Sequence, residues 1–316
     1  MASKITIVGA GSVGATLAFT LSQESYVSKI VLIDVIKDKA EGEATDIAQG
    51  TAFRDPISIY SGEYSDAAGS DIVIITSGVA RKPGQTRLDL AQTNVNIIKS
   101  IAPELGKYAP DALYIIVANP VDIMTYTFMK YSGIPENRIM GSGTQLDTAR
   151  LRYGLSNHYQ IAQKNIHAYV FGEHGDSSFI PWSVCNISGM RLDDYEKFVQ
   201  ASGQGIPPLD KEAMHQYVKK SGSEIIKKKG ATFYGVTVAV VNLIGMLLAD
   251  YETITTVSTM MHGEYGIEDV CLSCLAVIGP NGVKRTVPVE LTDDEVAKMH
   301  ISADSLHGII NGLKKD

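Results

Sequence analysis

The amino-acid sequence predicts an α/β protein, with a parallel β-sheet in its first half and a mixed α+β arrangement in its second. Two observations support this prediction. Short runs of β-branched residues alternate with helical patterns up to about residue 142, and longer helices mixed with strands follow. A chain of 316 residues, 45% hydrophobic and 20% charged, is long enough for two such units. We therefore expect a first unit over residues 1–142 and a second over residues 143–316.

The first unit contains four short, nearly continuous apolar runs that predict buried strands: Ile5–Val8, Ile30–Ile33, Ile72–Thr76 and Leu113–Val117. Helical patterns separate or follow these runs, around residues 12–24, 37–50, 90–108 and 122–132. Strands without polar alternation are typical of parallel sheets, because crossover helices bury both faces of the sheet. The pattern therefore predicts a parallel sheet covered by helices.

The second unit is less regular. We expect strands over Ile166–Phe171 and Val270–Ile278, and a surface loop over Ala201–Asp210, which holds two glycines and two prolines. Thr292 and Glu295 have the spacing of a capping box, in which each side chain bonds the other residue's backbone N–H. A helix should begin there.

Composition excludes several classes of protein. The formal charge of −7 offers no basic surface for a nucleic-acid backbone. Three cysteines cannot form a disulfide framework, which favours a reducing compartment, and we expect the cytoplasm. The longest apolar stretch, Gly235–Ala249, is interrupted by Asn242 and is too short to span a bilayer. We expect no membrane or targeting segment.

The run GAGSVG, residues 9–14, lies between the first predicted strand and the first predicted helix. Such glycines allow a tight turn, close approach of a pyrophosphate and close packing of helix on strand. This predicts a Rossmann-type dinucleotide site, although a glycine turn without a ligand is an alternative. The candidate cofactor-binding residues here are Gly9, Gly11, Val13 and Gly14.

Asp34 ends the second predicted strand, twenty residues after Gly14. A carboxylate in that place accepts hydrogen bonds from both ribose hydroxyls and repels a 2′-phosphate, so it favours NAD over NADP. The alternative is an ordinary turn residue at a strand end.

His174 lies between glycines in the segment GEHGD, directly after Ile166–Phe171. Asp147 and Arg150 are three residues apart and share one face of a predicted helix. A carboxylate beside His174 would fix its tautomer and stabilise the imidazolium, and a guanidinium would bind a substrate carboxylate through two hydrogen bonds. Considered alone, His174 is more often a structural or solvated histidine.

Two further segments follow predicted strands. Residues 77–88 contain Arg81, Lys82 and Arg87 among glycines, which suits a mobile lid over an anionic ligand; a solvated basic loop is the alternative. Asn119 follows Leu113–Val117, where its amide would hold a substrate oxygen or the nicotinamide, or simply form a turn.

Together these motifs resemble the NAD-dependent L-lactate and L-malate dehydrogenases, and over most of the chain the bacterial L-lactate dehydrogenases are nearer. The resemblance runs almost end to end. It rests on the glycine turn and on the runs RKPGQTRLDL, NPVD, GSGTQLDTAR and GEHGDSS. It implies hydride transfer between the nicotinamide and C2 of a 2-keto acid, with a histidine supplying the proton.

The same resemblance implies a role for each candidate residue. His174 is the general acid and base, Asp147 orients it, and Arg87 polarises the reacting carbonyl. Arg150 holds the substrate carboxylate, and Asn119 contacts both substrate and cofactor.

The identity of the acid depends on Arg81, which corresponds to the lid position that meets the variable end of the substrate. Lactate enzymes typically carry glutamine there, and malate enzymes carry arginine. A second carboxylate about 4–6 Å from this guanidinium would gain roughly 3–4 kcal/mol at an effective dielectric constant near 20. We therefore expect oxaloacetate and L-malate. Thr232 matches the lactate branch instead, so pyruvate and L-lactate are the alternative if Arg81 turns to solvent.

Arg152 and His167 match the pair that binds a phosphate of fructose 1,6-bisphosphate in allosteric bacterial lactate dehydrogenases. The resemblance also implies a homotetramer.

Two other functions are alternatives. A non-catalytic NAD-binding protein would not need His174, Asp147, Arg87 and Arg150 together. An NAD-dependent glycosidase would need a metal site. Cys271 and Cys274 supply too few ligands for structural zinc, so we expect no metal.

Overall fold

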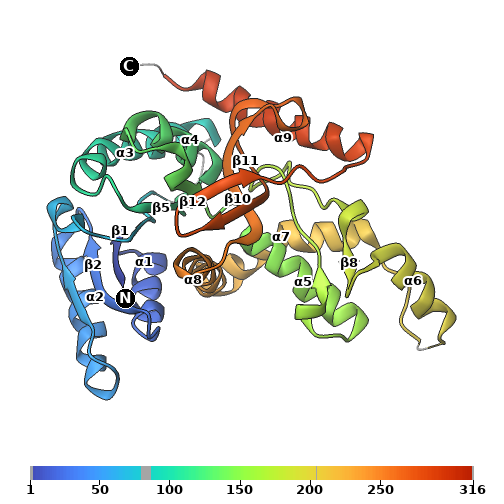
Figure 1. Ribbon diagram of the computed structural model, residues 1–316, viewed down its shortest axis with the longest axis horizontal. Helices are drawn as coiled ribbons and strands as arrows, with labels where there is room; N and C mark the ends of the chain where they lie inside the picture. Colours follow the sequence, from blue (N-terminus) through green and yellow to red (C-terminus); the bar gives the residue numbers. More distant parts are fainter. Residues whose placement is uncertain (1–2, 80–86, 204, 315–316) are drawn as a thin grey trace.

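The structure, a computed structural model, describes residues 3–79, 87–203 and 205–314, and its described strands form one nine-stranded sheet and one three-stranded sheet (Figure 1). Six strands of the large sheet are parallel, in the order β6-β5-β4-β1-β2-β3. Their bounds are β1 Ser3–Val8, β2 Val27–Ile33, β3 Ser58–Ser61, β4 Ile72–Ile75, β5 Leu113–Ile116 and β6 Ile139–Gly141.

Helices cover both faces of this sheet because its strands are apolar on both sides. On β2, Ile30 and Leu32 belong to a core shared with α1, α2 and α8, whereas Val31 and Ile33 belong to a core shared with α3, α4 and α9. The helices span α1 Ser12–Leu21, α2 Lys37–Gly50, α3 Arg87–Tyr108, α4 Val121–Ser132, α8 Tyr234–Leu248 and α9 Asp293–Gly312.

The second half of the chain continues the same sheet. Strands β10 (Thr253–His262), β11 (Glu268–Gly279) and β12 (Gly282–Thr286) are antiparallel to one another, and Ser258 of β10 pairs with Gly141 of β6. A third core packs helices against the small sheet: α5 Gln145–Tyr159, α6 Leu192–Ala201 and α7 Lys211–Lys229, with β7 Ile166–His167, β8 Asn186–Ile187 and β9 Met190–Arg191.

The predicted α/β class and the parallel sheet are confirmed, and helix α9 begins at the predicted capping box: the Thr292 hydroxyl accepts from the Glu295 N–H, and a Glu295 carboxylate oxygen accepts from the Thr292 N–H. Strands β3 and β6 were not predicted. Both are short, and a stretch of three or four residues carries little periodicity.

The prediction of a strand over Ile166–Phe171 is wrong beyond His167. The Val170 N–H donates to the Thr148 hydroxyl at 3.0 Å, and the Thr144 hydroxyl donates to the Val170 carbonyl. Side chains of α5 and of Thr144, the residue before it, thus take the backbone bonds that a neighbouring strand would have taken. The chain next to the predicted histidine is therefore fastened to α5.

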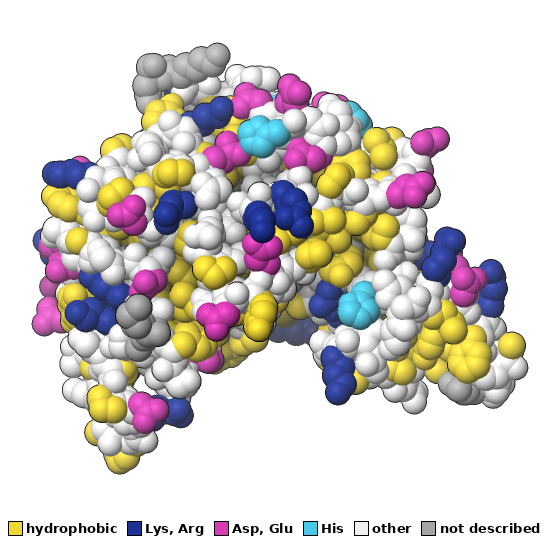
Figure 2. All heavy atoms as spheres, in the orientation of Figure 1, with side chains coloured by type: hydrophobic (Ala, Val, Ile, Leu, Met, Phe, Trp, Pro, Cys, Tyr) yellow, Lys and Arg dark blue, Asp and Glu magenta, His cyan; other side chains and the backbone are white. Residues whose placement is uncertain are grey.

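None of the helices in the described part of the chain combines the length and apolar character needed to cross a membrane. On the face shown in Figure 2, basic and acidic side chains are interspersed, and the surface is hollowed at its lower edge between the two ends of the molecule.

Candidate active site

The predicted cofactor residues follow the carboxyl ends of neighbouring parallel strands, where ligands bind in open α/β sheets. Gly9 directly follows β1 and has a φ of +108°, which favours glycine. A Cβ atom on Gly9 would lie 2.6 Å from Oγ1 of Thr76, and one on Gly14 would lie 1.8 Å from the Gly9 carbonyl oxygen. These glycines therefore allow α1 to pack tightly against the strand ends.

Gly11 has a different environment. Among the described residues, apart from its own chain neighbours, no atom lies within 4 Å of the place where its Cβ would be, and no side chain caps the N-terminus of α1. The first amides of α1 are thus open to an anion, and the helix dipole favours one there. This open cradle fits the pyrophosphate of a dinucleotide. Val13 is the second residue of α1 and is half-buried against the core.

The Asp34 carboxylate is fixed beside the glycine turn. It accepts the Ala10 N–H at 2.6 Å and the Ile36 N–H at 2.9 Å. Its position at the end of β2, next to the open N-terminus of α1, suits the ribose of the same ligand. The residues present thus fit NAD.

His174 and Asp147 lie together. The distance from His174 Nδ1 to Asp147 Oδ2 is 2.5 Å, and the side chains are 28% and 9% exposed. The other carboxylate oxygen of Asp147 accepts from Nη1 of Arg150 at 2.9 Å. The charge of Asp147 outweighs burial and raises the pKa of His174 to about 9. Burial raises the pKa of Asp147, but His174 and Arg150 together hold it below its usual value.

A second buried carboxylate approaches His174 from its backbone side. Asp122 of α4 is 2% exposed, and its Oδ2 accepts the His174 N–H at 2.8 Å. Its Oδ1 accepts the Ser258 hydroxyl at 2.6 Å. Burial raises the pKa of Asp122 to about 6. Sequence reasoning used Asp122 only as part of the NPVD run; a carboxylate one residue into an apolar helix start was the signal that pointed to it.

Arg150 and Thr232 line one pocket of about 380 Å³, together with Tyr153, Tyr217 and Ile225. The helix α7 passes close to Arg150 at Gly222, where an added Cβ would lie 3.3 Å from Nη2 of Arg150. Sequence reasoning missed Gly222. The signal in the sequence was a glycine inside a helix. Glycine there lowers helix stability by about 1 kcal/mol relative to alanine, so its presence suggests that a neighbouring group needs the space.

The structure describes only some of the other predicted substrate-binding residues. Asn119 is exposed at the end of β5, and its backbone carbonyl accepts from Nδ2 of the buried Asn94 at 2.7 Å. Arg81 lies outside the described residues. Arg87 is the first residue of α3, and its side chain is likewise outside the description.

Of the predicted effector pair, Arg152 is half-buried and His167 is exposed. Nε of Arg152 donates to the carbonyl of Ala168, the residue after His167, at 3.1 Å. The guanidinium lies 5.2 Å from the ring centroid of Tyr169, and burial lowers the pKa of Arg152. The Arg152 side chain thus lies against the backbone next to His167.

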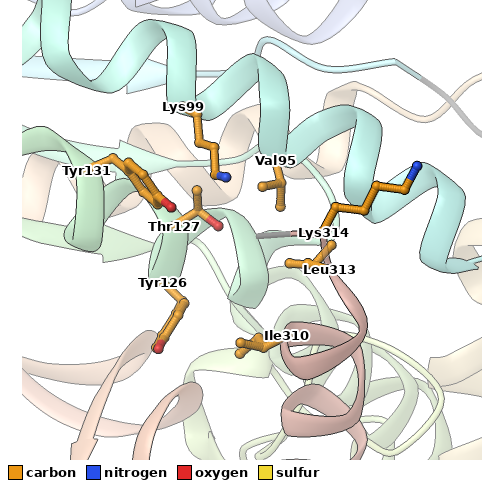
Figure 3. Close-up of a pocket in the computed structure, with 8 residues that line it drawn as sticks. All are labelled: Val95, Lys99, Tyr126, Thr127, Tyr131, Ile310, Leu313 and Lys314. Carbon is orange, nitrogen blue, oxygen red and sulfur yellow. The ribbon is translucent and has the colours of Figure 1, made fainter. Parts of the chain in front are cut away.

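Another pocket, of about 350 Å³, lies between α3, α4 and the end of α9 (Figure 3). Its polar lining residues include Lys99, Tyr126 and Tyr131. The apolar Leu313, which follows α9, also lines it. None of its labelled residues is a histidine or a carboxylate, whereas the His174 cluster contains both. Within the described ranges no group of side chains is arranged to hold a metal ion, and the three cysteines are buried and free.

Comparison with known proteins gives matches over the whole chain. The model for the lactate/malate dehydrogenase NAD binding domain matches residues 3–141, and that for the lactate/malate dehydrogenase alpha/beta C-terminal domain matches residues 144–316. L-lactate dehydrogenase 1 of Clostridium acetobutylicum is 47% identical over 311 residues, covering 98% of each chain. The L-lactate dehydrogenase of Thermoanaerobacterium saccharolyticum is 45% identical, covering 98% of this chain and 99% of that protein.

Solved structures agree. The minor L-lactate dehydrogenase of Enterococcus mundtii has a TM-score of 0.93 at 33% identity, covering 100% of this chain and 99% of that one. The L-lactate dehydrogenase of Clostridium thermocellum has a TM-score of 0.87 at 39% identity, covering 99% of this chain and 100% of that one.

The open cradle at Gly11 yields a test of cofactor binding. We expect Gly11→Ala to raise the Kd for NADH about tenfold or more, since the new methyl group would occupy the space that fits the pyrophosphate. Thermal stability should stay nearly unchanged, because that methyl group meets no protein atom. Fluorescence titration with NADH measures the affinity.

Gly42→Ala is the matched control, because an added Cβ at Gly42 of α2 also meets nothing within 4 Å. It should leave the Kd unaltered. Equal NADH affinity in Gly11→Ala and the native protein would place the pyrophosphate elsewhere.

Proposed function

The chain belongs to the lactate/malate dehydrogenase family, and we propose that it reduces pyruvate to L-lactate with NADH, and oxidises L-lactate in the reverse direction. It is an NAD-dependent oxidoreductase that acts on a CH–OH group. The observation that carries the proposal is the single cluster of His174, Asp147 and Arg150, with the 2.5 Å contact between the first two. It places a proton donor beside a cation that binds carboxylates.

His174 acts as the general acid during reduction. Because Asp147 binds Nδ1, the protonated ring keeps Nε2–H to donate to the carbonyl oxygen of the keto acid. The Asp147 carboxylate stabilises the imidazolium before the transfer and fixes the ring afterwards. In the oxidation of the hydroxy acid, neutral His174 accepts the hydroxyl proton at the same nitrogen.

Arg150 holds the carboxylate that every 2-keto acid carries, with its guanidinium donating in parallel to the two carboxylate oxygens. Arg87, at the start of α3, is assigned to polarising the keto oxygen on the strength of the family resemblance. NADH, when bound, supplies the hydride that is added to C2. Asp34, Gly9, Gly11, Val13 and Gly14 would hold it, with Asn119 near the nicotinamide.

The choice of pyruvate replaces oxaloacetate, which the sequence analysis favoured because of Arg81. Two observations support pyruvate. The most similar relatives named above are L-lactate dehydrogenases. Among the described residues that line the pocket beside Arg150, Arg150 itself is the cation, and Thr232, Tyr217 and Ile225 are uncharged. This described part of the pocket thus supplies one cation for one carboxylate, while Arg87 is assigned to the keto oxygen. Oxaloacetate remains the second candidate through Arg81 alone.

Substrate selectivity gives a direct test. The native enzyme should show a kcat/KM for pyruvate at least about tenfold above that for oxaloacetate, because the pocket balances one negative charge. Arg81→Gln should leave this preference in place. Steady-state oxidation of NADH with each acid measures both ratios.

Lys82→Gln, in the same basic segment, is the control for a general loss of positive charge. If the native enzyme prefers oxaloacetate, and Arg81→Gln but not Lys82→Gln reverses that preference by roughly a hundredfold, malate is the product. If NADH is oxidised with neither acid, the dehydrogenase proposal fails altogether.

The raised pKa of His174 predicts opposite pH profiles for the two directions. Reduction requires the protonated ring, so kcat/KM for pyruvate should hold up to about pH 9 and then fall about tenfold per pH unit. Oxidation requires the neutral ring, so kcat/KM for L-lactate should rise about tenfold per pH unit up to about pH 9 and then level off. Initial rates between pH 5 and pH 10.5 test both profiles.

Asp147→Asn removes the charge that raises the pKa, so the fall in pyruvate reduction should move to lower pH and the rate should drop ~100-fold. Asp304→Asn, on the exposed side of α9, is the control. An unmoved profile in Asp147→Asn would assign the transition to another group.

We also propose that the finer features of the family apply here. The two units meet at residues 142 and 143, and the protein is a cytoplasmic homotetramer. Exposed Tyr234 and Val238 on α8 support an interface between subunits. Arg152 and His167 bind a phosphate of fructose 1,6-bisphosphate, and their adjacent positions support this assignment.

Activation by the sugar bisphosphate tests the effector site. We expect fructose 1,6-bisphosphate to lower the KM for pyruvate, and His167→Ala to abolish the effect without altering the unactivated rate, since His167 is an exposed residue. Fructose 6-phosphate serves as the ligand control. Identical kinetics with and without the bisphosphate at subsaturating pyruvate would remove the proposal.

A further inference from the structure

We propose that Asp122 is a positioning residue for His174, and that its negative charge helps to keep that histidine protonated for the reduction step. The inference rests on the proposed function, because it concerns the acid–base role of His174. It adds a second carboxylate, on α4, to the one that α5 supplies.

The first support is geometric. Asp122 accepts two hydrogen bonds, one from the His174 N–H at 2.8 Å and one from the Ser258 hydroxyl at 2.6 Å. Asp122 is 2% exposed, and Ser258 is fully buried on β10. A buried carboxylate is tolerated only where donors satisfy it, and here one of two donors is the backbone of the catalytic histidine itself. The hydrogen bond therefore holds the backbone N–H of His174, and with it the start of this residue's backbone, in a fixed position.

The second support is the choice of a charged residue. An asparagine at position 122 could bond the same two partners, because its oxygen can accept the His174 N–H and its amide can donate to the Ser258 hydroxyl, which also accepts. Hydrogen bonding alone therefore does not require a charged residue here. The buried charge of an aspartate is costly unless a neighbouring cation stabilises it. A neighbouring imidazolium does so.

The charged and titratable groups around the pair come from several elements. His174 faces Asp147 and Arg150 from α5 as well as Asp122 from α4, and Arg150 opposes protonation of the ring. Asp122 faces Glu173, which precedes His174 in its loop, and Cys271 from β11. Because the pKa of Asp122 is about 6, this carboxylate is ionised at neutral pH, where it adds to the effect of Asp147.

The test compares Asp122→Asn with the native enzyme by two measurements. In the first, the fall in kcat/KM for pyruvate should move about one pH unit lower in the variant, since losing one nearby opposite charge lowers the pKa of a histidine by about that much. In the second, ¹H–¹⁵N NMR titration of the His174 ring, assigned by the signal lost in His174→Gln, should show the same shift without any turnover.

Glu295→Gln is the matched control. Glu295 is also a buried carboxylate, 6% exposed, and it accepts from a serine hydroxyl and from backbone N–H groups, but on α9 rather than at His174. Its replacement should cost stability and leave the His174 titration in place. A shift in this variant equal to that in Asp122→Asn would overturn the proposal, because the effect would then follow from general loosening.

A second variant covers poor folding of Asp122→Asn. Asp122→Ser removes the same charge, and its hydroxyl can still accept a hydrogen bond. The His174 titration should then shift lower by about the same amount as in Asp122→Asn. An unchanged His174 titration in folded Asp122→Asn, or in Asp122→Ser where the former does not fold, overturns the proposal. If the native enzyme fails to reduce pyruvate while the NMR shift is present, the proposed substrate fails and the role of Asp122 stands.

Discussion

The 2.5 Å contact between His174 and Asp147 is the interaction on which the proposed chemistry depends, and the fold must hold its two partners from different segments. Asp147 lies on α5 and His174 on the loop that follows Gly172. Removing two charged groups from water is unfavourable, so the pair persists only where the backbone leaves them no alternative. The bonds from α5 to Val170, and the pairing of Gly172 with Ser273 of β11, fasten the histidine loop on both sides.

The joined sheet explains how a third element reaches the same histidine. Strand β10 pairs with β6 at Gly141, where an added Cβ would lie 2.4 Å from Thr125 of α4. Only glycine allows α4 and β10 to approach so closely at this point. As a consequence Asp122 of α4 and Ser258 of β10 meet over the His174 backbone. The antiparallel strands are thus part of the active-site support as well as an extension of the sheet.

Local patterns made much of this structure readable from the sequence. The parallel strands have uninterrupted apolar runs, the glycine turn has a fixed spacing, and Asp147 and Arg150 are separated by one helical turn. The hydrogen bond between Asp122 and Ser258 joins residues 136 positions apart, so no short sequence pattern predicts it. The same limit explains the wrong strand after His167, because the hydroxyls of Thr144 and Thr148 on another element replaced the expected ladder.

The two bonds of Asp147 link substrate binding to the state of the acid. Arg150 shares this carboxylate with His174, and its charge opposes protonation of the ring. When Arg150 receives the carboxylate of a keto acid, as the proposed function requires, its positive charge is balanced by the substrate. The field of Asp147 then acts on His174 with less opposition, and the protonated ring is favoured. An anionic substrate would therefore strengthen the acid that its own reduction needs, whereas a neutral ligand of the same shape would leave Arg150 opposing it.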